Sequence, residues 1–142
     1  MQDIFLAKYS ATGALQWAKR FGATGDVNYI EFGSGVAADS AGNVVLTGYI
    51  RGPMDFGGGV LPTADLAYIS DTFIAKFGSD GSHIWSKRYG DTQNQNGRAI
   101  VTDSANNVLA VGDFIGAVNF GGGALTTPST VNPHVYIVKL SP

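Results

Sequence analysis

One stretch of the sequence occurs twice, and it constrains the fold more than any other feature. Residues 39–59 begin with Asp-Ser-Ala-Gly-Asn and end with Asp-Phe-Gly-Gly-Gly, while residues 103–123 begin with Asp-Ser-Ala-Asn-Asn and end with Asn-Phe-Gly-Gly-Gly. The two copies align without a gap, at a constant offset of 64 residues from Asp39 to Asp103. Each copy has the residues of a tight turn, an apolar strand and a glycine corner. Such a repeat is typical of β-propellers and related arrays.

A second pattern lies outside this stretch. Residues 3–9, 71–77 and 134–140 have the two-residue period of a strand, and each carries a lysine at its sixth position. The first two are followed by glycine turns and then by residues 14–22 and 82–90, which share a tryptophan, a Lys-Arg pair and a final glycine. We find no helical period longer than two turns. The chain therefore consists of strands and turns.

These segments give groups of two, four and three consecutive strands along the chain. The sequence predicts an all-β fold of β-propeller blades, each of four antiparallel strands, with about two repeats and one extra strand. We expect a single all-β domain over residues 1–142, with repeat-derived segments 3–70 and 71–133 and a terminal strand at 134–140. A β-sandwich is the alternative, although a sandwich does not require two copies of one four-strand pattern.

Composition excludes several classes of function. The chain has 142 residues, a net charge of −2 and 20 glycines, so it can bury a core but offers no excess positive charge for nucleic acid. It has no cysteine, which rules out disulfides, thiolate zinc sites and cysteine nucleophiles. No apolar run reaches the roughly 20 residues of a membrane span. We therefore expect no nucleic-acid partner and no membrane insertion, and we find no signal peptide at the first residue.

The repeated motifs are D-x-F-[IL]-A-K-[YF], G-x-x-x-W-x-K-R-[FY]-G, D-S-A-x-N-V and x-F-G-G-G-x-L. Together they resemble the SBBP, or seven-bladed β-propeller, repeat of bacterial proteins. The resemblance covers nearly the whole chain. It implies an extracellular or cell-surface location in a bacterium, and a protein without a defined catalytic activity.

Four repeated residues have structural roles in this interpretation. Trp17 and Trp85 lie four residues beyond a turn glycine, where a ring can cover the seam between blades; a tryptophan that stacks on sugars is the alternative. Asp39 and Asp103 open turns in which the carboxylate can accept backbone N–H groups, with a calcium ligand as the alternative. Lysines of the strands are expected to stay solvated or to pair with these turn aspartates.

Motifs for catalysis, metal binding and cofactor binding are missing from the sequence. His83 and His134 occupy non-equivalent strand positions, and Glu31 is the only glutamate. Neither glycine run is followed by the lysine and helix of a phosphate loop. We predict no catalytic residue, no metal, no cofactor and no enzyme activity.

Loops of unequal length mark the candidate binding face. The connection between repeats is longer in the first copy than in the second, while the turns at the opposite end of the strands have the same length. Variable loops on a constant scaffold are where binding usually occurs. The exposed candidates for a glycan or protein ligand are Asp26, Asn28, Tyr29, Glu31, Asp91, Gln93, Asn94, Gln95 and Asn96. Solvated loops without a ligand are the alternative.

About two blades cannot close a propeller, which needs four to eight. We expect open edges that bind copies of the chain, or further blades if the 142 residues are part of a longer protein. The favoured function is a non-catalytic structural or interaction module of an exported bacterial propeller. A lectin-like carbohydrate binder that uses the variable-loop face is the alternative.

Overall fold

The computed structural model describes residues 2–22, 29–62, 68–129 and 131–142, and these contain strands but no helix. The strands are β1 (Ile4–Tyr9), β2 (Leu15–Phe21), β3 (Glu31–Ala38), β4 (Val44–Ile50), β5 (Met54–Asp55), β6 (Val60–Leu61), β7 (Asp71–Phe77), β8 (His83–Tyr89), β9 (Gln95–Thr102), β10 (Val108–Phe114), β11 (Ala117–Asn119), β12 (Ala124–Thr126) and β13 (His134–Leu140).

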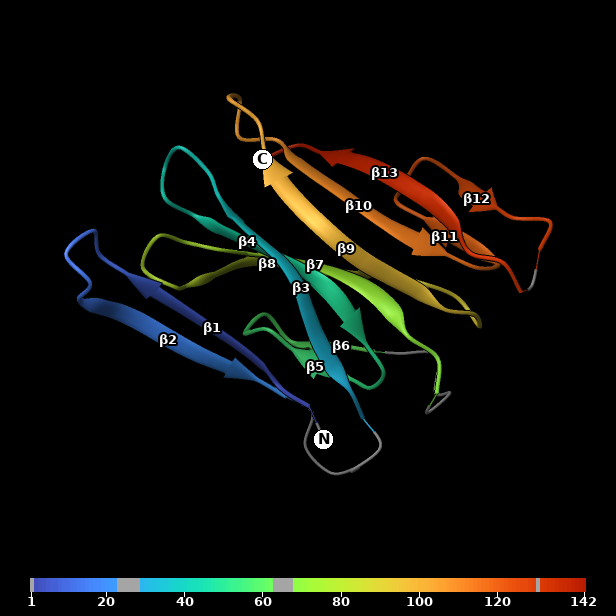
Figure 1. Cartoon of the computed structure of the whole chain (residues 1–142), viewed down its shortest axis with the longest axis horizontal. Coiled ribbons are helices and arrows are strands. Elements are labelled where there is room, and N and C mark those ends of the chain that lie inside the picture. Colours follow the sequence, from blue (N-terminus) through green and yellow to red (C-terminus); the bar gives the residue numbers. More distant parts are fainter. Residues whose placement is uncertain (1, 23–28, 63–67, 130) are drawn as a thin grey trace.

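Three antiparallel sheets follow one another along the chain (Figure 1). They are β1-β2, then β3-β4-β7-β8, then β9-β10-β13, and strands pair with their neighbours in chain order apart from the small β5-β6 and β11-β12 hairpins. The predicted groups of two, four and three strands are confirmed. The bounds predicted for residues 71–77 and 134–140 also agree with β7 and β13. We refer to the three sheets as the first, middle and last sheets.

The middle sheet is buried on both faces, and this distinguishes the fold from a two-layer sandwich. In β7, Phe73 and Phe77 belong to a core shared with the first sheet, whereas Ile74 belongs to a core shared with the last sheet. In β4, Leu46 and Val45 divide between the two cores in the same way. Side chains alternate between faces of a strand, so β4 and β7 serve two interfaces at once. Three sheets packed in series are the arrangement of propeller blades.

The repeated turn has the same structure in both copies. Oδ1 of Asp39 accepts hydrogen bonds from the backbone N–H groups of Ala41 and Asn43, at 3.0 and 2.9 Å. Asp103 accepts the equivalent pair two and four residues ahead. The turn needs a left-handed residue, which is Gly42 with φ 77° in one copy and Asn106 with φ 63° in the other. This Asx-turn geometry fixes the β3-β4 and β9-β10 connections.

The two glycine runs form the tips of short hairpins, where the sequence predicted only chain corners. Oδ1 of Asp55 accepts the N–H groups of Gly57 and Gly59, and both glycines have positive φ. Phe56 lies in the chain between β5 and these glycines. It is 1% exposed and packs in the first core, between the first and middle sheets. The β11-β12 hairpin likewise places Val118 in the second core, which lies between the middle and last sheets. The hairpins therefore fill the seams between sheets.

Candidate binding surfaces

Two turn aspartates form ion pairs with the repeated strand lysines. Lys76 Nζ lies 3.2 Å from Asp39, with both side chains buried, and Lys139 Nζ lies 2.8 Å from Asp103 nearer the surface. Burial opposes ionisation of Asp39, but the Asn43 hydrogen bonds and Lys76 hold its pKa below the usual value. Hydrogen bonds from Lys139 and Asn107 lower the pKa of Asp103. These contacts serve the scaffold.

A second repeated ion pair joins adjacent strands of one sheet. Arg88 Nη2 lies 2.5 Å from Asp71, and Arg20 lies at the same distance from Asp3. A Cβ on Gly90 would stand 1.8 Å from Oδ1 of Asp71, so the glycine that ends the repeated motif leaves room for the carboxylate. Burial raises the pKa of Asp71 to about 6, against the effect of Arg88. The pair is a structural element of the first and middle sheets.

The two tryptophans lie at the seams between sheets. Trp17 Nε1 donates a 3.0 Å hydrogen bond to the Ser79 carbonyl, so β2 of the first sheet is joined to the turn after β7 in the middle sheet. Its ring packs against Gly81, where a Cβ would come within 2.9 Å. Trp85 packs against the second core. These contacts leave both rings partly buried.

The residues predicted for ligand binding fall into four groups. Asp26 and Asn28 lie outside the described residues. Glu31 and Gln95 are 1% and 0% exposed, so the expectation that they lie on the surface is wrong. The strands β3 and β9 begin at these residues, and their side chains point into the protein rather than into loops.

Other members of the predicted set hold the loops in place. Asp91 accepts hydrogen bonds from the Gln95 amide and from the Ala117 N–H, which ties the loop after β8 to the β11-β12 hairpin. Gln93 donates its N–H to Asp91. The ring of Tyr29 packs over Gly52, where no Cβ would fit. Each of these residues has a structural contact.

Asn94 and Asn96 lie together in a polar pocket that we call the loop-face pocket. Its volume is about 340 Å³, and its polar lining comprises Tyr49, Arg51, Ser70, Asn94, Asn96, Arg98 and Asp113. The residues come from β4 and the loops beside the middle sheet and from β9 and β10 of the last sheet. The repeat pattern did not predict Arg51, Arg98 and Asp113 as site residues, because they lie far apart in the chain.

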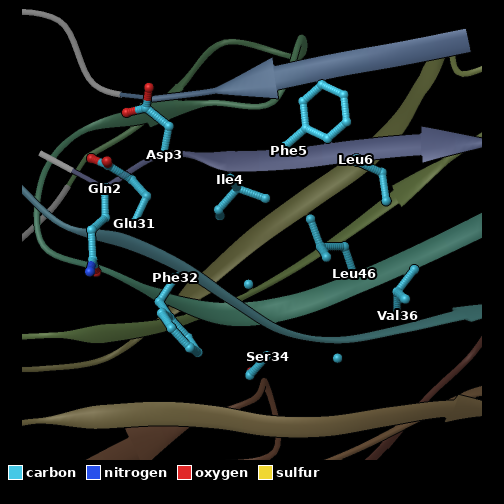
Figure 2. Close-up of a pocket in the computed structure, with 12 residues that line it drawn as sticks. Gln2, Asp3, Ile4, Phe5, Leu6, Glu31, Phe32, Ser34, Val36 and Leu46 are labelled. Carbon is cyan, nitrogen blue, oxygen red and sulfur yellow. The ribbon is translucent and has the colours of Figure 1, made fainter.

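A second concavity, the end groove, lies along β1 and the exposed face of β3. Its volume is about 540 Å³. Figure 2 shows Ile4 and Leu6 of β1 pointing toward Leu46, while Phe5 points to the opposite side of β1 and Val36 of β3 lies near the other end of the groove. In the described residues β1 pairs only with β2, and the parallel Gln2–Ile30 bridge lies before the start of β1, so the inner edge of β1 lacks a neighbouring strand.

The end sheets also expose residues whose repeat equivalents are buried. Two neighbouring positions of the repeated strand matter here. The position that we call forward is occupied by Leu6, Ile74 and Ile137. The position before it, which we call rear, is occupied by Phe5, Phe73 and Tyr136. Forward Leu6 and rear Phe73 share the first core, and forward Ile74 and rear Tyr136 share the second. The remaining rear residue, Phe5, is 71% exposed, and the remaining forward residue, Ile137, is 76% exposed.

The part of the chain that the structure describes holds no group of three or more His, Asp or Glu side chains that could bind a metal ion. In the same residues, no helix is long and apolar enough to cross a membrane.

No protein-family model matches the chain. The chain is 30% identical, over 153 aligned residues, to an uncharacterized WD repeat-containing protein of Acanthamoeba polyphaga mimivirus. This match covers 91% of the chain but 11% of the relative, so the chain spans a small part of that protein's length. WD repeats are four-stranded propeller blades. The similarity and the serial packing of antiparallel sheets both indicate that the chain is a propeller-like repeat protein. Membership of the SBBP family stays a prediction.

Proposed function

We propose that this chain is a non-catalytic interaction module of the β-propeller type, whose two end faces bind further blades of the same repeat. The blades belong either to a longer chain or to other copies of this one. The observation that carries the proposal is the exposure of Phe5 and Ile137 at positions that both internal interfaces bury.

The two end faces are complementary rather than alike. Each internal interface joins the forward position of one sheet to the rear position of the next. The first sheet exposes its rear residue and the last sheet exposes its forward residue. The same rule therefore pairs Ile137 with Phe5 of the following copy, which is a head-to-tail contact. Full burial of one such side chain contributes about 1.5–3 kcal/mol.

The unpaired inner edge of β1 also supports the addition of a further repeat. In the middle sheet, β7 pairs along its inner edge with β4, and Lys76 reaches the aspartate of the β3-β4 turn. Lys8 occupies the equivalent position in β1, and its Nζ donates instead to the carbonyls of Gly42 and Ser79. Within the described residues, no aspartate pairs with Lys8. A turn of the repeated Asp-Ser-Ala type from another repeat would supply one.

The mass of the chain in solution, measured by light scattering over a range of concentrations, tests this function. We expect the mass to rise with concentration, and Ile137→Asp or Phe5→Asp to return it to the monomer, because a charge cannot be buried unpaired at the interface. Ile84→Asp is the matched control, since Ile84 is exposed on β8 of the middle sheet, outside both end faces. A mass that stays monomeric for the unmodified chain, or falls equally with Ile84→Asp, would contradict the proposal.

An exported bacterial protein displayed at the cell surface remains our prediction for the source and location, on the resemblance of the motifs alone. Carbohydrate recognition by the loop face is likewise a prediction, and the loop-face pocket gives it a specific form.

A further inference from the structure

The loop-face pocket departs from the repeat, unlike the surrounding scaffold. Asn96, Arg98 and Asp113 stand where the other copy has Phe32, Ser34 and Tyr49. In the middle sheet Phe32 and Tyr49 stack, with ring centroids 5.3 Å apart. The last sheet replaces this aromatic pair with an amide and a carboxylate, joined by a 2.9 Å hydrogen bond from Asn96 to Asp113. The fold itself does not require these polar residues, since the other copy lacks them.

The pocket residues are held in place by contacts between sheets. Ser70 donates through its N–H and its Oγ to Oδ1 of Asn94, both at 3.0 Å, and Oγ also contacts Oδ1 of Asn96 at 3.0 Å. The Asn94 carbonyl accepts the N–H of Ile115 at 2.9 Å. Both asparagine oxygens therefore face protein donors. A site fixed in this way is preorganised for a ligand.

The pocket has an excess of positive charge and a donor without an acceptor. Asp113 is paired with Arg98, which leaves Arg51 as the second guanidinium. Nε of Arg51 is buried and has no hydrogen-bond partner among the described residues. Among the described residues Arg51 forms no ion pair, so its positive charge in the pocket is uncompensated. A guanidinium binds a carboxylate through two parallel hydrogen bonds, so the acceptor that fits best is a carboxylate.

We propose that the loop-face pocket binds a carboxylate-bearing monosaccharide, with Arg51 holding the carboxylate and the side-chain amide nitrogen of Asn94 donating to a hydroxyl group. The volume of about 340 Å³ lies at the small end of ligand pockets, which matches one sugar ring. Amide, carboxylate and guanidinium groups dominate the polar lining, and these are hydrogen-bond partners for sugar hydroxyls. This binding is independent of the packing between end faces.

Titration of the isotopically labelled full chain by NMR tests the site. The probes are sodium glucuronate, neutral glucose and N-acetyl-glutamate amide, which presents a peptide carboxylate without a sugar. We expect glucuronate to shift the amide signals of Ser70, Asn94 and Asn96, and the other two probes to bind at least tenfold more weakly. These chemical-shift changes are measured on the unmodified chain, so the result does not depend on whether a substituted variant folds. Absence of shifts with glucuronate, or shifts elsewhere, would overturn the proposal.

Arg51→Gln tests the role of the guanidinium. Loss of a charged hydrogen bond should weaken glucuronate binding roughly ten- to a hundredfold. Lys87→Gln removes the same charge from the exposed surface of β8 and should leave the affinity unchanged at physiological salt. Equal affinity of the Arg51→Gln variant, or glucose binding as tightly as glucuronate, excludes a carboxylate subsite. Tighter binding of N-acetyl-glutamate amide would instead assign the pocket to acidic peptides.

Discussion

Replacing Ile74 with alanine measures how firmly the middle and last sheets are packed together. Ile74 is 0% exposed and lies in the core between them. The change removes three carbons, whose transfer from water contributes about 0.8 kcal/mol each, and it leaves a cavity in a sealed interface. We therefore expect the free energy of unfolding to fall by about 2–5 kcal/mol. This is a large share of the roughly 5–15 kcal/mol that stabilises a typical domain.

The chain supplies its own control for this experiment. Ile137 is the same residue at the same repeat position but is 76% exposed. In dilute solution, where end faces are unoccupied, Ile137→Ala should change the unfolding free energy by less than about 0.5 kcal/mol. Urea unfolding of both variants, followed by circular dichroism at matched low concentration, gives the comparison. Equal losses for the two variants would refute the assignment of Ile74 to an internal interface and of Ile137 to an open one.

Three other predictions follow from the buried polar groups. Asp39→Asn keeps the turn acceptor but removes the charge opposite buried Lys76, and it should cost about 3–5 kcal/mol by urea unfolding, whereas the more exposed Asp103→Asn should cost clearly less. The Asp71 carboxyl should titrate near pH 6 by carbon-13 NMR; a value below 4 would contradict the burial argument. Because its folded pKa lies above the unfolded value, the stability due to Asp71 should be present below about pH 4 and lost as pH rises through 6.

The sequence was sufficient to predict the main sheets, because each strand occurs in at least two copies. The two-residue period assigns the strands, and the constant offset of Asp39 and Asp103 aligns them into successive blades. The short hairpins could not be assigned in this way, since β5 and β6 have two residues each and show no period. Their available signal in the sequence was the run of three glycines that follows Asp55 and Phe56.

Site prediction failed where burial decides the role of a residue. Glu31 and Gln95 were assigned to exposed loops because they lie between recognisable strands, yet the first strands of the middle and last sheets begin at these residues. The loop-face pocket was found only in part, since Arg51 and Asp113 become neighbours through sheet packing. Departure from the repeat was the available signal, as Arg98 replaces Ser34 and Asp113 replaces Tyr49.

The central claim is that the two end faces bind each other in the order that the internal interfaces follow. The chain has no cysteine, so Phe5→Cys and Ile137→Cys can be introduced without background. Facing strands of packed sheets lie about 10 Å apart, beyond the reach of a disulfide, so a thiol-reactive cross-linker of about that span is the probe. With this cross-linker, the double variant should give a ladder of cross-linked multimers or one closed multimer, while each single variant stays monomeric. A double variant that stays monomeric, or dimers formed as efficiently by Phe5→Cys alone, would contradict head-to-tail packing.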